Sequence, residues 1–499
     1  MTSPSMDRAA ALERAGAFIG QPLAMLIGGQ WVQAQSGDTI DTLNPATGER
    51  LTSVPHAGKT DLDIAVAAGQ AALDGPWRSM TASQRQRLIW RLGDLLEANA
   101  AEFAALETLD NGKPFSDALL RDVPAAANLF HYYAGWATKL NGETIAVSYP
   151  GEWHSYTLHE PVGVAGLILP WNAPLMMAAS KLAPALAAGC TVVLKPAEQT
   201  PLTALRLGQL VIEAGIPPGV VNILTGNGST LGQAIVDHPG ISKISFTGST
   251  LVGRKIVQTA SQDFKRVTLE LGGKSAVLIF PDADLSKAVP AAARAIFANS
   301  GQVCNAGSRL YVHADVYDQV LEGLVANAAS LRVGPGMDAD TQMGPVISET
   351  QLDRVMGYID EGRRNGASIA SGGVRLGERG YFIAPTVVVG TRPEMSIRRE
   401  EIFGPVVCVM PFDGDEQLAA VAAEVNATSY GLGAHVWTRD LSRAHLLARR
   451  LHVGTVRVNG GGLDPALPFG GFKESGWGRE NGRQGVEAFT ELKSVMIGL

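Results

Sequence analysis

Four short runs of apolar, mostly β-branched residues constrain the fold of this chain more than any other feature. They cover residues 164–169, 191–194, 220–224 and 243–246, carry almost no charge, and alternate with stretches of helical length. Strands of this kind are buried on both faces and belong to parallel sheets with right-handed helical crossovers. Such a sheet binds ligands outside the carboxyl ends of its strands. We therefore predict an α/β fold with a ligand site at that edge.

A second series of strand-like runs follows, at residues 276–280, 310–313, 381–389, 406–410, 433–437 and 455–459. Two αβ domains in a chain of 499 residues predict an active-site cleft between them. Two more strand-like runs, within residues 143–160, have the pattern of a hairpin, which alone is marginally stable in water. We expect this hairpin to complete its sheet against another segment, such as residues 489–497 of a partner subunit.

Composition excludes several classes of function. The net charge of −7 comes without a basic patch, so a nucleic-acid partner is not expected. Only three cysteines (Cys190, Cys304 and Cys408) occur, which fits a reducing compartment and predicts a cytoplasmic protein. Residues 1–20 lack the apolar run of a signal peptide, and three prolines break the uncharged segment 161–180, so no membrane span is predicted.

Cys304 lies in the loop NSGQVCNAGSR (residues 299–309), between an Ala-rich helical run and a strand-like run. A cysteine in such a loop can be held exposed as a nucleophile, although a lone cysteine is often a buried packing residue. The flanking Gly, Gln and Asn argue against apolar burial, but the loop alone leaves both interpretations open. Two other stretches favour a nucleophile: ELGGK (270–274), with Glu270 as a candidate base, and PWNAP (170–174).

Two turns carry features of a dinucleotide site. FTGST (246–250) ends a predicted strand and opens a helix, where backbone N–H groups attract phosphate, although helix capping alone explains the same residues. Glu198, in KPAE after the second strand, can accept hydrogen bonds from ribose hydroxyls and would repel a ribose phosphate; the alternative is an exposed acid in a loop.

Other catalytic signatures are missing from the sequence. The nine histidines show no metal-ligand spacing, so no metal is predicted, and no G-x-S-x-G elbow of a serine hydrolase occurs. GGKS (272–275) is similar to the end of a P-loop, but Thr268 stands where the first glycine is needed. We reject nucleoside triphosphate hydrolysis.

Seven strings in order make the chain resemble the NAD(P)-dependent aldehyde dehydrogenase superfamily from about residue 28 to the C-terminus. They are PWNAP, KPAEQTP (195–201), FTGST, LELGGK (269–274), GQVC (301–304), EEIFGPV (400–406) and PFGGFKESGWGRE (468–480). The resemblance implies an aldehyde dehydrogenase-like α/β fold and a homodimer or homotetramer. The implied fold has a Rossmann-type NAD-binding domain (1–138 and 160–269), an αβ catalytic domain (270–475) and a small β oligomerisation arm (139–159 and 476–499).

The resemblance also implies the chemistry. Cys304 matches the nucleophile that forms a thiohemiacetal and then a thioester, and Asn172 matches the side chain that holds the oxyanion with the Cys304 N–H. Glu270 matches the base that activates water, which implies a free carboxylic acid as product. Lys181 and Glu480 match an accessory proton-relay pair.

For the cofactor, the resemblance implies NAD, with NADP as the weaker alternative. Lys195 and Glu198 match the contacts to the adenine ribose, Ser249 the pyrophosphate contact, Glu401 the nicotinamide-ribose ligand, and Phe403 a residue beside the ring. The implied cofactor site further includes Ile168, Trp171, Gly248, Val252, Gly253 and Leu271.

The substrate channel departs from the aromatic-lined pattern of acetaldehyde-type relatives, because Ala173, Met176, Met177 and Ser180 follow Asn172, while Val303 and Asn305 flank Cys304. Small and flexible residues leave room for an aromatic or bulky apolar aldehyde. The loop 460–464 is Gly-rich and lacks an aromatic residue. GQVCNAGSR is most similar to phenylacetaldehyde-type dehydrogenases. Two alternatives stay open: a cofactor-independent thiol esterase using Cys304 and Glu270, and a non-catalytic structural protein of the same fold.

Overall fold

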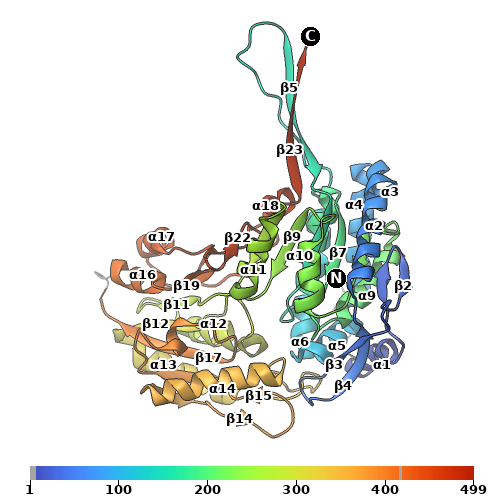
Figure 1. Ribbon diagram of the computed structural model, residues 1–499. Helices are drawn as coiled ribbons and strands as arrows, with labels where there is room; N and C mark the ends of the chain where they lie inside the picture. The colour runs from blue at the N-terminus through green and yellow to red at the C-terminus, as the bar shows by residue number, and fades with distance from the viewer. Residues whose placement is uncertain (1–6, 415–417, 463) are drawn as a thin grey trace.

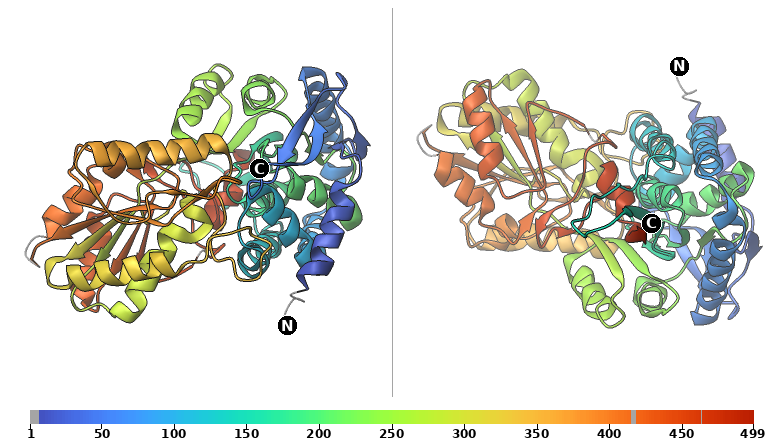
Figure 2. Two further views of the ribbon diagram at one scale, coloured as in Figure 1. Left: turned by 90° about the horizontal axis from the view of Figure 1, so that it is seen from below. Right: turned by 90° about the horizontal axis from the view of Figure 1, so that it is seen from above.

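The computed structural model describes residues 7–414, 418–462 and 464–499. The start of the segment examined for a signal peptide, residues 1–6, and Leu463 of the Gly-rich loop lie outside the described residues. Two αβ halves lie side by side, one coloured blue to green and the other yellow to red (Figure 1, Figure 2). Each half is built around its own sheet, so the predicted α/β class is confirmed.

The first sheet has eight strands, in the order β2-β1-β8-β7-β6-β9-β10-β22. Its five central strands β8, β7, β6, β9 and β10 are parallel, and all positions of the first four are buried. The strand bounds are β1 Met25–Ile27, β2 Gln30–Val32, β6 Val164–Ile168, β7 Thr191–Lys195, β8 Val221–Ile223, β9 Lys243–Thr247, β10 Arg266–Glu270 and β22 Gly476–Trp477.

Helices cover both faces of this sheet, as the uncharged strands require. One face packs on α2 (Lys59–Asp74), α10 (Gln233–Asp237) and α11 (Thr250–Ala260). The other packs on α4 (Ala82–Ala98), α5 (Ala100–Asn111), α7 (Val123–Ala134), α8 (Pro174–Ala188) and α9 (Leu202–Ala214).

The second sheet has seven strands, in the order β13-β16-β17-β12-β11-β19-β20, and is parallel except for β13. Its strand bounds are β11 Ala276–Ile279, β12 Arg309–His313, β13 Ser368–Ser371, β16 Thr386–Val389, β17 Val406–Phe412, β19 Gly433–Trp437 and β20 Thr455–Val458. One face packs on α12 (Leu285–Phe297) and α13 (Tyr317–Ser330). The other packs on α14 (Glu349–Arg364), α16 (Leu418–Asn426) and α17 (Leu441–Arg450).

The run predicted as one strand over 381–389 is two. Phe382–Ile383 (β15) pairs with β14 (Arg375–Leu376), whereas β16 enters the second sheet. Pro385 lies between them and has no N–H for a ladder hydrogen bond, which explains the break.

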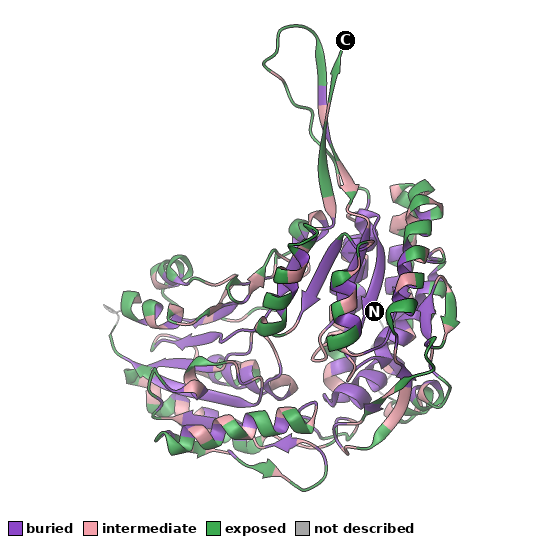
Figure 3. Cartoon of the chain, in the orientation of Figure 1, coloured by how far each residue is buried: buried purple, intermediate pink, exposed green. Residues whose placement is uncertain are grey.

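The arm differs from the predicted hairpin. Only Trp153–Pro161 (β5) forms a strand, and it pairs along nine residues with β23 (Thr490–Gly498) of its own chain, not of a partner. Residues 143–145 lie alongside β5 through two backbone hydrogen bonds of 2.9 Å, Ile145 N to Ser155 O and Thr157 N to Glu143 O. The two-stranded arm projects from the body and is largely exposed, whereas the central strands of both sheets are buried (Figure 1, Figure 3).

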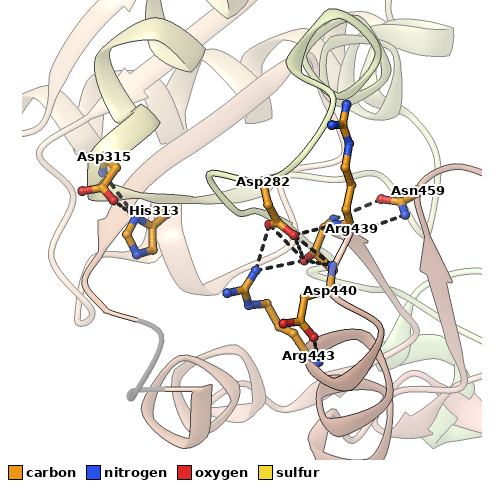
Figure 4. A network of polar contacts seen from close by, with 8 residues as sticks. Asp282, His313, Asp315, Arg439, Asp440, Arg443 and Asn459 are labelled. Carbon is orange, nitrogen blue, oxygen red and sulfur yellow. Dashed lines mark hydrogen bonds and ion pairs between the residues drawn. The ribbon is translucent and has the colours of Figure 1, made fainter.

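A polar network fixes the end of the second sheet that carries β19 and β20 (Figure 4). The Asp282 carboxylate accepts hydrogen bonds from the backbone N–H groups of Arg439 (2.7 Å) and Asp440 (2.9 Å), and it pairs with Arg443 (2.8 Å). The Asn459 amide, just past β20, bonds both backbone groups of Thr438, just past β19. The two strands are therefore locked in register.

Across residues 7–414, 418–462 and 464–499, no helix is both long and apolar enough to cross a membrane.

Candidate active site

A cavity of about 750 Å³ lies between the two halves. It is bounded by the carboxyl ends of β9 and β10, the start of α8, the loop before β12 and the loop after β20. This is the edge at which an open parallel sheet binds ligands. The cavity wall includes Asn172, Glu270, Cys304 and Glu480.

The loop that carries Cys304 is held in an unusual backbone conformation. Asn299, Ser300 and Gly301 have φ values of 48°, 55° and 72°, in the left-handed region. A Cβ at Gly301 would lie 2.0 Å from the Gly404 carbonyl oxygen, so only glycine fits there. The Ser300 hydroxyl donates to Gly344 O (2.7 Å), and the Gln302 side chain accepts from Ile347 N (2.8 Å). Strain held in place by such contacts is typical of functional sites.

Asn172 is tied to the same loop. Its Nδ2 donates to Gln302 O (2.9 Å), and its backbone carbonyl accepts from Asn299 Nδ2 (2.8 Å). A carboxamide nitrogen carries two hydrogens, and within the described residues no second acceptor is bonded to it. One N–H therefore stays available to a ligand beside Cys304.

Glu270 ends β10 with its side chain in the cavity wall and is only 3% exposed. Neither carboxylate oxygen has a hydrogen-bond partner among the residues described. Burial, and then the nearby negative charge of Glu480, raise the pKa of Glu270 well above its usual value. A buried carboxyl with a raised pKa and no partner is the state in which a general base accepts a proton near neutral pH.

Cys304 is partly exposed to the cavity. Burial, and then the negative charges of Glu270 and Glu401, raise the pKa of the Cys304 thiol to about 12. The thiol is therefore neutral in the resting protein, and it must lose its proton during any reaction in which its sulfur attacks.

Lys181, on α8, forms a buried ion pair with Glu480 and donates a further hydrogen bond to Ser245 Oγ (3.2 Å). Glu480 belongs to the cavity wall, whereas Lys181 lies behind it. The pair thus connects the Glu270 end of the cavity to the polar interior of the first sheet.

The residues expected to bind adenine ribose lie at the ends of two neighbouring strands. Ile168, at the end of β6, is in register with Lys195, at the end of β7. The buried Lys195 ammonium donates to Pro196 O (3.0 Å) and pairs with Glu198 Oε2 at 3.4 Å, and burial lowers its pKa. Glu198 is part-exposed, so its carboxylate can still accept bonds from a ligand.

Ser249 is the N-cap of α11, where its Oγ accepts from Val252 N (3.4 Å). Gly248 and Ser249 face the cavity, and a Cβ at Gly248 would lie 2.4 Å from the Phe246 ring. Gly253, one turn further, has no room for a Cβ because Leu271 Cδ2 would be 2.6 Å away. Glycine is therefore required at both positions by packing against Phe246 and Leu271, and the start of α11 presents its backbone N–H groups at the cavity edge, as an anion site needs.

The next part of the cavity holds Glu401, whose Oε1 accepts from Gly273 N (2.9 Å) and whose pKa is raised to about 7 by burial. Phe403 has φ of 60° and packs edge-to-face with Trp171, with ring centroids 5.2 Å apart. Four residues predicted to bind the cofactor line this part of the cavity: Trp171, Leu271, Glu401 and Phe403.

The substrate residues also line this cavity. Ala173 is the N-cap of α8, and Met176, Met177 and Ser180 follow on the helix face that the cavity meets. Val303 and Asn305 lie on either side of Cys304. The cavity as a whole is not free of aromatic residues, however. The Gly-rich loop noted in the sequence contributes Gly460, Gly461 and Gly462 to the wall. Other residues of the wall were not singled out from the sequence, among them Leu129, His435, Trp437, Arg457 and Phe469.

No group of three or more His, Cys, Asp or Glu side chains arranged to hold a metal ion occurs in the described parts of the chain.

Comparisons with known proteins agree with this geometry. The sequence profile of the aldehyde dehydrogenase family matches residues 31–495. The chain is 48% identical to a putative aldehyde dehydrogenase, DhaS, of Bacillus subtilis over 98% of both chains. It is 47% identical to a phenylacetaldehyde dehydrogenase of Pseudomonas fluorescens, over 95% of this chain and 96% of the other.

The structure superposes on an NAD+ complex of an aldehyde dehydrogenase from Bacillus cereus with a TM-score of 0.95, at 47% identity, covering 97% of this chain and 98% of the other. A profile match over almost the whole length, together with relatives near half identity, leaves a single conclusion. The chain belongs to the aldehyde dehydrogenase family.

Proposed function

We propose that this protein oxidises an aldehyde to the carboxylic acid with NAD as hydride acceptor and Cys304 as nucleophile. One observation carries the proposal: a thiol, an amide N–H without a second partner and an unpartnered buried carboxyl share one cavity, at Cys304, Asn172 and Glu270. The same cavity contains the glycine-lined start of α11, which suits a dinucleotide.

In the first step the Cys304 sulfur attacks the aldehyde carbon while the thiol proton passes to water in the cavity, giving the oxyanion of a thiohemiacetal. The developing oxyanion accepts hydrogen bonds from Asn172 Nδ2 and the Cys304 backbone N–H. Because Asn172 is anchored to Gln302 O, its remaining N–H is oriented before the substrate arrives.

When bound, NAD supplies the acceptor for the hydride that leaves the substrate carbon. Glu270 then takes a proton from the water that attacks the thioester on Cys304, which releases the acid and restores the thiol. The Lys181–Glu480 pair relays protons to and from Glu270. Glu480 lies close enough for its negative charge to raise the pKa of Glu270.

Cofactor choice follows from Glu198. Its carboxylate accepts hydrogen bonds from ribose hydroxyls but repels a phosphate on the same ribose, so NAD is preferred and NADP is the weaker alternative. Lys195, Ser249 and Glu401 complete the contacts to the ribose, pyrophosphate and nicotinamide ribose. Ile168, Trp171, Val252, Leu271 and Phe403 support the bound cofactor by packing.

The proposed substrates are aromatic or bulky apolar aldehydes, such as phenylacetaldehyde. Ala173, Met176, Met177 and Ser180 leave space on the α8 wall, and each substrate methylene that meets an apolar wall adds about 0.8 kcal/mol, roughly a fourfold effect. Refilling this wall with Ala173→Phe or Ser180→Trp should shift the preference from phenylacetaldehyde toward acetaldehyde. A wild-type ratio of specificity constants near one, unmoved by either substitution, would mean that this wall does not set substrate size.

Two other functions are weaker. A thiol esterase would use Cys304 and Glu270 but leave the helix start at Ser249 and the ribose contacts without a role. A non-catalytic protein would have no use for an unpartnered, buried Glu270 carboxyl. A screen of NADH formation over an aldehyde panel, with an ester hydrolysed in the absence of NAD as control, separates the three functions.

We further propose a homodimer or homotetramer. Two strands alone are marginal in water, and β23 leaves Leu492 61% and Met496 52% exposed. Sedimentation of wild type against Leu492→Glu tests this, since the substitution should yield smaller species. All three cysteines are free, which supports a reducing, cytoplasmic location.

A further inference from the structure

The part of the cavity wall that α12 and the second sheet form has no role in the proposed reaction, and the space beside it is called the branch below. This branch lies between α12 and the face of the second sheet that α12 covers. Its helix side consists of Ala291, Ala292 and Ala295, and its sheet side of Val277 on β11, His435 on β19 and Arg457 on β20. Three methyl side chains on the helix leave the space open above the strands.

Arg457 is the unusual member of this wall. It occupies an inward position of β20, directly opposite His435, and its Nε atom is buried without a hydrogen-bond partner. Among the residues that the structure describes, no carboxylate lies within ion-pair distance of its guanidinium. The side chain is partly exposed as a whole, but its buried Nε–H lacks an acceptor, and a guanidinium without an ion partner at a cavity wall is suited to bind an anion.

Other cations of the cavity wall differ from Arg457. Lys113 is paired with both Glu107 and Asp122, and Arg121 with Asp117 at 3.9 Å. Arg294 and Arg354 are exposed to solvent, so their charges are hydrated, and Arg354 also donates to Glu401 O (2.7 Å). An anion inside the branch therefore has Arg457 as its available positive charge within the described residues.

His435, the neighbour of Arg457 on β19, adds no charge to the branch. Burial, and then the positive charge of Arg457, lower the pKa of His435 to about 4, so its ring is neutral at physiological pH. A neutral imidazole can still donate one N–H to a bound carboxylate. Arg457 also lies within electrostatic range of the Cys304 thiol, so the branch begins close to the nucleophile.

We propose that Arg457 forms a carboxylate-binding subsite, and that among the bulky aldehydes of the proposed function those bearing a carboxylate at the far end of a short apolar or aromatic spacer react best. This deepens the proposed function and rests on it. The guanidinium fork binds the carboxylate bidentately, the alanines of α12 contact the spacer, and the aldehyde reaches Cys304. The product is a dicarboxylic acid.

The test compares 4-formylbenzoate with the neutral 4-formylbenzamide, which has the same shape at its far end. Wild type should favour the benzoate in kcat/KM by about tenfold or more, mostly through KM, as a hydrogen-bonded charge pair does. Arg457→Met should bring the ratio near one while 4-formylbenzamide turnover changes by less than about threefold. Arg457→Lys keeps the charge but loses the fork, and should fall between the two.

A matched control and a binding readout separate this inference from the reaction. Arg294→Met removes the same charge from the exposed part of the wall and should leave the ratio unchanged. Terephthalate, the product of 4-formylbenzoate, should raise the melting temperature of wild type without NAD but not that of Arg457→Met. If wild type makes no NADH with any aldehyde, the proposed function fails, whereas the terephthalate result still judges the subsite.

Three results would overturn the subsite. The first is a wild-type ratio near one. The second is an equal loss for both aldehydes in Arg457→Met, with a slower alkylation of Cys304 by iodoacetamide, which would mean that Arg457 serves the thiol. The third is an Arg294→Met variant whose ratio collapses as far as that of Arg457→Met, which would show a general field in place of a bound carboxylate.

Discussion

Replacing Asn172 by alanine tests the proposed oxyanion site. The Asn172 amide donates one hydrogen to Gln302 O at 2.9 Å, and its other hydrogen is the proposed donor to the oxyanion. Removing one such donor typically lowers kcat by about 100-fold to 1,000-fold, which corresponds to roughly 2.7–4 kcal/mol of transition-state stabilisation.

The same substitution also removes an anchor of the Cys304 loop. A single neutral hydrogen bond contributes about 1 kcal/mol net, so loss of the anchor alone would cost roughly fivefold in rate. Ser300 and Gln302 retain their own bonds to Gly344 and Ile347, so the loop should keep its conformation. The two effects therefore differ in size by more than an order of magnitude, about 100-fold against fivefold.

The assay is the pre-steady-state rate of NADH formation with phenylacetaldehyde, with Asn299→Gly as the matched control. Glycine keeps the left-handed backbone at position 299 but removes the bond from its amide to Asn172 O. We expect Asn172→Ala to lose about 100-fold or more and Asn299→Gly less than about tenfold. Losses of equal size in the two variants would refute the oxyanion role, because the effect would then come from loop geometry.

Three further predictions follow from the buried carboxyl groups and the ribose contact. Glu270→Gln should form NADH in a single burst and then stall. Because the pKa of Glu270 is raised, its ionised form costs folding stability above the unfolded-state pKa of about 4.3, so the variant should melt higher than wild type at pH 8 and equally at pH 4. Glu401, with a pKa of about 7, loses its charge as pH falls, so NAD affinity measured by calorimetry should weaken from pH 8 to pH 6 in wild type but not in Glu401→Gln. Glu198→Ala should narrow the preference for NAD over NADP in kcat/KM; a wild type that works better with NADP would contradict the role of this carboxylate.

The parallel strands could be predicted because a strand that is buried on both faces must be a short run of uncharged, apolar residues, which is visible in the sequence. Runs such as those of β6, β7 and β19 lack charge almost completely, and their order along the chain implies the crossovers. β10 was missed, since it begins with an exposed arginine and ends with Glu270. Its place in the sheet depends on its neighbour β9, not on its own pattern.

The partner of β5 could not be chosen from the sequence. The residues of β23 suit an arm in either case, because the ladder hydrogen bonds are the same whether the second strand comes from the same chain or from another. The two strands are separated by more than 300 residues, so no short-range turn signal fixes their pairing.

Site residues within strings such as PWNAP and GQVC could be anticipated, whereas His435 and Arg457 could not. These two reach the cavity through the register of β19 and β20. One local signal was available. Arg457 stands between Val456 and Val458 in a predicted strand of the second sheet, and a charged side chain is unusual there because parallel strands are buried on both faces.

The most direct test of the proposed reaction is NADH formation by Cys304→Ala beside wild type, with NAD binding measured on both proteins. Wild type should reduce NAD with aldehydes. The variant should produce no NADH with any aldehyde yet bind NAD with similar affinity, because the cofactor contacts belong to other residues. Appreciable NADH formation by Cys304→Ala would contradict covalent catalysis through this thiol.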